Sequence, residues 1–73
     1  MKTLNNLSIG DRMRVITIEK DSPVKRKLLD MGIPPGVEIE VIGKAPLGDP
    51  IELIVRGYKL TLRNNEAKLV SGK

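Results

Sequence analysis

Apolar and polar residues alternate along four stretches of the chain, with the two-residue period of a β-strand that is buried on one face. The predicted strands lie at 12–19, 37–41, 51–56 and 58–63. In the second, Val37, Ile39 and Val41 are expected to face inward, because the residues between them are glutamates. In the first, apolar residues fall on both faces. That pattern predicts a strand covered on both sides for part of its length.

One stretch has helical periodicity instead. Ser22 and Pro23 are typical of a helix start, with serine as the N-cap and proline at the first helical position. Gly32 is expected to end the helix in the left-handed conformation, with Ile33 packing back as in a Schellman motif. The sequence therefore predicts a helix over 22–31. Its apolar stripe consists of Val24, Leu28 and Leu29.

Short turns connect the remaining strands, and Leu4 and Leu7 are expected to reach the core from a helical turn or loop before the first strand. Asn64-Asn65 predicts a turn, followed by a last short strand at Ala67 and Leu69. We expect one domain over 1–73, mainly β, with a frayed tail at 71–73. A sheet this small must curl to bury one face, which favours an SH3-like five-stranded barrel with one helix inserted after the first strand. A five-stranded OB-type barrel is the competitor, although its helix usually comes later in the chain.

The amino-acid composition limits the kinds of catalytic and metal-binding site that the chain can form. The 73 residues contain no cysteine and no histidine, which removes thiolate and imidazole metal ligands and the commonest general base. The nine carboxylates are scattered without the spacing of a calcium loop, and the glycines match no phosphate-binding motif. We therefore expect no enzyme, no catalytic residue, no metal ligand and no cofactor held by an identifiable site.

Charge and aromatic content bear on the class of partner. The net charge is +4 and Tyr58 is the only aromatic residue. A small basic nucleic-acid-binding barrel is therefore the alternative function, although such barrels usually stack bases on several aromatic side chains, and we expect no nucleic-acid partner. No signal peptide or bilayer-spanning run is present, so the expected location is cytoplasmic. The basic residues that would share a patch if the helix packs beside the first strand are Arg12, Arg14, Lys20, Lys25, Arg26 and Lys27.

Two segments are candidates for partner binding, and each also has a purely structural explanation. The end of the predicted helix would serve as a docking patch if one leucine and Met31 stay exposed, or as a cap of the core. The proline-rich loop between the second and third strands would be a docking surface held in shape by its prolines, or a turn that sets strand register. Arg63 and Glu66 are spaced for an ion pair. The candidate partner-binding residues are Leu28, Leu29, Met31, Pro46, Leu47, Gly48, Asp49 and Pro50.

Four motifs in order along nearly the whole chain resemble the FeoA family, a small cytosolic component of ferrous-iron uptake. They are LxxLxxG at 4–10, KLLDMGIPPG at 27–36, APLGDPI at 45–51 and LRNNEA at 62–67. The resemblance implies an SH3-like barrel that assists or regulates FeoB, a membrane transporter of Fe(II) with a cytosolic GTPase domain. It implies contact with the membrane only through that partner. Pairing of edge strands would permit a weak homodimer. The FeoA family is associated with transition metals, but this chain contains no histidine or cysteine that could bind one.

Overall fold

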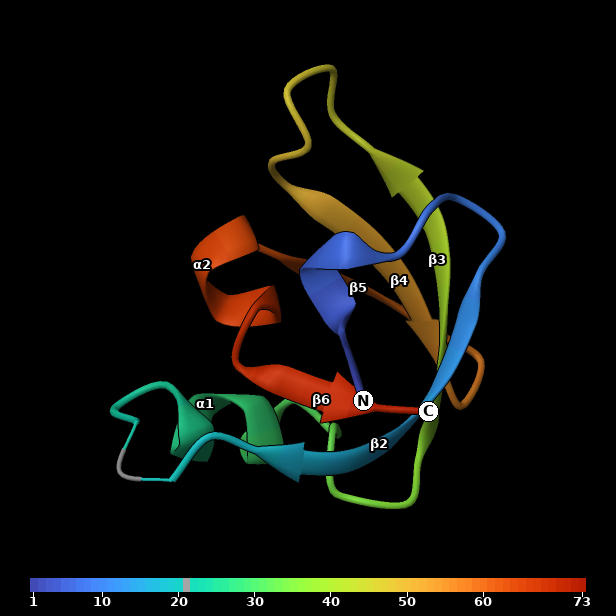
Figure 1. Cartoon of the computed structure of the whole chain (residues 1–73). Coiled ribbons are helices and arrows are strands. Elements are labelled where there is room, and N and C mark those ends of the chain that lie inside the picture. The colour runs from blue at the N-terminus through green and yellow to red at the C-terminus, as the bar shows by residue number, and fades with distance from the viewer. Residues whose placement is uncertain (21) are drawn as a thin grey trace.

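Six strands form one antiparallel sheet in the order β1-β6-β2-β3-β4-β5 in the computed structural model, which describes residues 1–20 and 22–73 (Figure 1). The strands are β1 Lys2–Thr3, β2 Arg12–Ile18, β3 Glu38–Lys44, β4 Ile51–Val55, β5 Tyr58–Leu62 and β6 Val70–Gly72. The helices are the 3-10 turn η1 Leu4–Asn6, α1 Lys25–Asp30 and α2 Asn64–Ala67. Six strands replace the expected five because Lys2–Thr3 adds a short strand beside β6.

The sheet curls because β2 is shared between its two halves. The first residues of β2 pair with β3, whereas the later ones pair with β6 across a register shift between Val15 and Thr17. A bulge of this kind bends a strand and interrupts its alternation. Val15 and Ile18 are therefore both buried while Ile16 and Thr17 are exposed. The prediction that this strand is covered on both faces is therefore wrong, because the buried side chains switch from one face to the other at the bulge.

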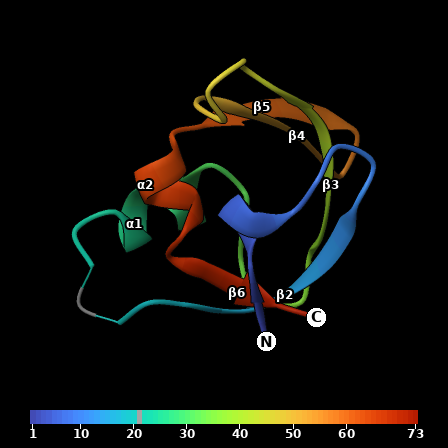
Figure 2. The same cartoon turned by 45° about the horizontal axis from the view of Figure 1, so that its top comes forward.

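The curved sheet encloses one aliphatic core, with η1 and α2 in contact beside it (Figures 1 and 2). Leu4 and Leu7 reach this core from η1 and the residue after it, as expected. The outermost strands β1 and β5 do not pair with each other within the described residues, so the barrel is partly open. The buried hydrophobic side chains are Leu4, Leu7, Met13, Val15, Ile18, Leu28, Ile33, Val37, Ile39, Val41, Ile51, Leu53, Val55, Leu62, Ala67 and Val70.

The helix α1 begins three residues later than predicted and ends one residue earlier, at Asp30, with the predicted glycine cap after it. The Ser22 hydroxyl accepts a hydrogen bond from the Val24 N–H at 3.1 Å, within a turn that precedes the first helical residue. At the other end Gly32 has a φ of +95°. The Ile33 N–H donates to the Leu28 carbonyl and the Gly32 N–H to the Leu29 carbonyl, both at 3.1 Å. These two bonds are the expected Schellman motif.

The C-terminal segment differs from the prediction. Asn64–Ala67 forms the helix α2 rather than a turn, and the last strand begins at Val70. That strand lies between β1 and β2, and Lys73 exchanges main-chain hydrogen bonds of 2.9 and 3.1 Å with Arg14. The expected frayed tail is therefore wrong, because the last residues have paired strands on both sides. In the described part of the chain, no helix has the length and apolar character needed to cross a bilayer.

Candidate functional site: a groove between α1 and β5

The two adjacent leucines near the end of α1 differ in their burial. Leu28 is fully buried and anchors the helix in the core, which removes it from the candidate partner-binding residues. Leu29 is 36% exposed and Met31 is half-buried against the edge of the core. The turn at Gly32 holds Met31 at the surface, because the chain reverses there and returns Ile33 to the interior. Leu29 and Met31 are therefore available to a partner.

Met31 lines a groove that the sequence did not reveal. The groove holds about 420 Å³ and lies between the end of α1 and the β4–β5 hairpin. We call it the α1–β5 groove. Its walls combine apolar and charged side chains. The residues that line it are Asp30, Met31, Gly32, Val55, Arg56, Tyr58, Lys59 and Leu60.

The hairpin supplies most of the residues in this groove. Arg56 and Gly57 form its two-residue turn, with positive φ values of 52° and 82°, the geometry that closes a hairpin tightly. Tyr58, the first residue after the turn, is 74% exposed. The sequence signal that could have identified it is the placement of the only aromatic residue on a predicted strand beside a turn glycine.

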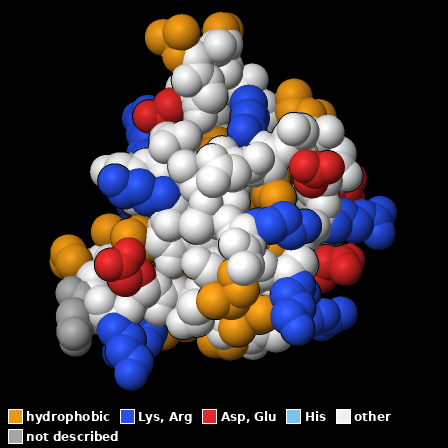
Figure 3. All heavy atoms as spheres, in the orientation of Figure 1, with side chains coloured by type: hydrophobic (Ala, Val, Ile, Leu, Met, Phe, Trp, Pro, Cys, Tyr) orange, Lys and Arg blue, Asp and Glu red, His pale blue; other side chains and the backbone are white. Residues whose placement is uncertain are grey.

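The proline-rich loop lies elsewhere. The loop between β3 and β4 projects at one end of the molecule, far from α1 in both ribbon views (Figures 1 and 2). Leu47 at its tip is 96% exposed, and Figure 3 shows hydrophobic side chains on this projection. Asp49 Oδ1 accepts a hydrogen bond from the Asn64 N–H at 3.1 Å, which ties the loop to the start of α2. The candidate partner-binding residues therefore belong to two separate surfaces, with Pro46, Leu47, Gly48, Asp49 and Pro50 on the loop.

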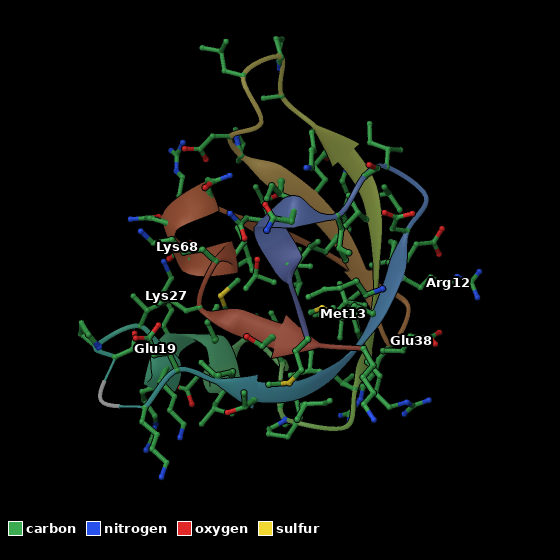
Figure 4. The ribbon with its side chains drawn as sticks, in the orientation of Figure 1. Arg12, Met13, Glu19, Lys27, Glu38 and Lys68 are labelled. Atoms are coloured by element: carbon green, nitrogen blue, oxygen red, sulfur yellow. The ribbon has the colours of Figure 1, made fainter. Side chains whose placement is uncertain are left out.

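The basic residues expected to share one patch do not all lie on the same side of the described structure. Figure 4 shows Arg12 and Lys27 on opposite sides of the molecule. Arg12 approaches Glu40 at 3.7 Å, and Arg14 Nη1 donates to the Gly36 carbonyl at 2.9 Å. Arg26 approaches Asp30 at 3.4 Å on α1. Arg12, Arg14 and Arg26 therefore each contact an oxygen acceptor close to them.

A second hollow is lined by both positively and negatively charged residues. It holds about 440 Å³ and includes Arg12, Glu38, Glu40 and Arg56. Across residues 1–20 and 22–73, no three His, Cys, Asp or Glu side chains come together in a group able to hold a metal ion. Asp21 lies outside the described residues. The hollow is therefore less apolar than the α1–β5 groove, and within the described residues it holds no group able to bind a metal ion.

Glu66 has a different partner from the expected one. Its carboxylate lies 2.6 Å from Lys27 Nζ on α1, and it accepts a hydrogen bond from the Arg63 N–H at 2.9 Å. The predicted ion pair with the Arg63 side chain is replaced by this main-chain cap of α2. The hydrogen bond from Lys27, with a smaller contribution from the Arg63 N–H, lowers the pKa of Glu66 below its ordinary value. Glu66 thus links α2 to α1 through its ion pair with Lys27.

Replacing Glu66 with glutamine should destabilise the protein by about 1 kcal/mol at neutral pH. The glutamine still caps Arg63 but loses the charge, and the gain from Lys27 is limited because that side chain is 60% exposed. A carboxyl whose pKa is lowered by folding contributes stability above its unfolded pKa and loses it as pH falls through its folded pKa. The stabilities of both forms in urea should therefore differ most above the pKa of an unfolded glutamate, about 4.3, and converge as the pH falls through the lowered pKa of folded Glu66. A difference that grows on acidification would contradict this role for Glu66.

A sequence model of the FeoA domain matches residues 2–73. The chain belongs to the FeoA domain family. The solved FeoA-like protein of Clostridium acetobutylicum is 49% identical with a TM-score of 0.88, and the match covers 96% of this chain and 85% of that one. The FeoA of Stenotrophomonas maltophilia, an SH3 domain protein solved in complex with zinc, is 26% identical with a TM-score of 0.86, covering 100% of this chain and 91% of that one. The predicted SH3-like fold and family resemblance are confirmed.

A curated relative is much longer than this chain. It is the Fe(2+) transport protein A/Fe(2+) transporter FeoB fusion protein of Porphyromonas gingivalis, 31% identical over 64 residues. The match covers 88% of this chain but only 8% of the fusion protein. In that protein a FeoA-like segment and a ferrous-iron transporter are therefore parts of one polypeptide.

Proposed function

We propose that this chain is a non-enzymatic accessory protein of ferrous-iron uptake that binds the cytosolic part of a FeoB-type transporter. The observation that carries the proposal is the fusion protein of Porphyromonas gingivalis, in which the two components share one chain. A covalent link keeps two modules at a high effective concentration. A FeoA-family domain on a separate chain achieves the same association by non-covalent docking.

The α1–β5 groove is the surface that we assign to this docking. It is concave, and it places the apolar side chains of Met31, Tyr58 and Leu60 beside charged groups. Flexible methionine suits a surface that must adapt to a partner. Bound there, the domain regulates the transporter by binding its states unequally, because only a difference in affinity shifts a conformational equilibrium. Fe(II) is the ion transported, and no step of this function requires the chain to bind it.

Met31→Glu should weaken binding to the transporter at least tenfold while the domain remains folded. The substitution places a carboxylate within an apolar contact but leaves the core residue Leu28 unchanged. Leu47→Glu is the matched control, because it makes the same charge change on an exposed apolar side chain of the distant loop. Binding is measured with the purified cytosolic region of a FeoB-type transporter from the same organism, by calorimetry at physiological salt.

Three results are informative. Loss of binding only in Met31→Glu supports the groove. Loss only in Leu47→Glu assigns docking to the loop and overturns the groove. Absence of any binding by the unaltered domain, together with recovery of nucleic acid in a salt-sensitive pull-down, contradicts the accessory role itself.

A further inference from the structure

The β5 strand has a free edge. It is the outermost strand of the sheet, and within residues 1–20 and 22–73 it pairs only with β4. The two-residue turn makes Val55 and Tyr58 a hydrogen-bonded pair, and such pairs alternate along an antiparallel ladder. The N–H and C=O groups of Lys59 and Thr61 therefore point away from β4. Among the described residues, neither finds another main-chain partner.

The opposite edge of the sheet is different. β1 contains only Lys2–Thr3, too short to serve as a template for another strand. β5 has five residues, about 17 Å of extended chain. Of the two edges of the sheet in the described residues, the β5 edge is therefore the one long enough to accept an additional strand.

The α1–β5 groove follows this edge. Tyr58, Lys59 and Leu60 are consecutive residues, and all three line the groove. Consecutive residues of a strand point to opposite faces of the sheet, so a groove that touches all three passes along the side of the strand. Its other wall is formed by Met31 and Gly32. A strand lying against β5 would place a side chain between Met31 and Leu60.

The charges beside the groove indicate the chemistry of the incoming segment. Asp30 already approaches Arg26 at 3.4 Å, and Lys59 approaches Glu52 at 2.8 Å. Within the described part of the chain, Arg56 forms no ion pair. Of the two cations that line the groove, Arg56 is therefore the one outside an ion pair among the described residues, and it is positioned to meet a carboxylate of the partner.

We propose that the β5 edge binds an extended segment of the transporter's cytosolic region as an additional strand. The segment places an apolar side chain between Met31 and Leu60 and a carboxylate beside Arg56, while its main chain bonds to Lys59 and Thr61. Strand addition of this kind obtains affinity from the main chain and specificity from alternate side chains. The inference rests on the proposed function, because it specifies how the same partner is held.

Thr61→Pro is the decisive variant. It deletes the outward N–H of β5 and leaves the bonds to β4 intact, and proline is tolerated on an edge strand when its missing N–H faces solvent. Thr61→Ala is the matched control, because it removes the side chain and keeps the N–H. We expect the unaltered domain and Thr61→Ala to bind the purified cytosolic region equally, and Thr61→Pro to bind at least tenfold more weakly. Thermal unfolding and ¹H–¹⁵N spectra check that each variant is folded.

A second measurement tests strand addition without the Thr61→Pro variant. Amide hydrogen exchange of the unaltered domain should slow at Lys59 and Thr61 when the transporter region is added. Arg56→Glu should weaken binding about fivefold, whereas Lys20→Glu, the same change at an exposed residue before α1, should leave it unchanged.

The outcomes separate this inference from the proposed function. Equal binding by Thr61→Pro with unchanged exchange at Lys59 and Thr61 overturns strand addition and leaves the accessory role standing. A dimer of the isolated domain that Thr61→Pro abolishes assigns the edge to a second copy and also overturns it. Absence of binding by the unaltered domain overturns both proposals.

Discussion

Gly72→Ala should destabilise the domain by about 3 kcal/mol or more, because no space exists for the added methyl group. A Cβ atom on Gly72 would overlap the Arg14 carbonyl oxygen and lie 2.8 Å from Met13 Cγ. Relief requires β6 to move away from β2, which disrupts the pairing that closes the fold. A domain of this size is stabilised by only about 4–11 kcal/mol, so the loss is a large part of the total. Urea unfolding followed by circular dichroism measures it.

The neighbouring residue provides the control for this prediction. Ser71 lies in the same strand and pairs with Thr3 and Thr17. Ser71→Ala adds no atom, so its effect should stay below about 1 kcal/mol. A Gly72→Ala domain as stable as the original would show that β6 is not held against β2 as the structure describes.

Leu28→Ala should destabilise the domain by about 2–5 kcal/mol, while Leu29→Ala should cost less than about 1 kcal/mol. The two leucines are adjacent in α1, but Leu28 is 0% exposed and Leu29 is 36% exposed. Truncating the first leaves a cavity among core residues, and truncating the second mainly changes the surface. Thermal and urea unfolding of the two variants provide a direct comparison.

This pair also tests the division of the KLLDMGIPPG motif between core and surface. Binding of the transporter region by folded Leu28→Ala should be retained, since the lost methyl groups face the interior. If Leu29→Ala proves the more destabilising change, α1 is rotated relative to the structure and the surface position of Met31 must be reassigned.

Much of the fold follows from local sequence. The alternation at Val37, Ile39 and Val41 was sufficient to predict a half-buried strand, and Gly32 with Ile33 was sufficient to predict the helix end. Both depend on interactions between residues close in sequence. The SH3-like arrangement follows because a small aliphatic sheet with one early helix has few ways to bury a face.

The predictions that were wrong depend on contacts between residues that are far apart in the sequence. The bulge in β2 depends on which neighbour pairs with each half of the strand, so the alternation around Ile16 misleads. The segment 71–73 resembles a tail in isolation, and only its position between β1 and β2 makes it a strand. Glu66 was matched with Arg63 because their spacing is local, whereas Lys27, its actual ion-pair partner, is 39 residues away.

The candidate site was predicted only in part for the same reason. Met31 was identified from the helix motif, but the opposite wall of its groove comes from β4 and β5. No local pattern places Leu60 across from Met31, because that juxtaposition results from the curl of the whole sheet. The loop at 45–50 was conspicuous in sequence, yet it lies at a different end of the molecule (Figure 1).

The pairing of β1 with β6 brings the two chain ends side by side, and β5 lies at the other end of the strand order (Figures 1 and 2). A polypeptide attached at either end would therefore leave from the same side of the domain. The domain can be spliced onto a larger protein, or immobilised on a sensor surface through a terminal tag, with its β5 side still turned outward. A short linker between residues 73 and 1 would likewise span little distance, which makes circularly permuted versions practical tools for presenting that side to a partner.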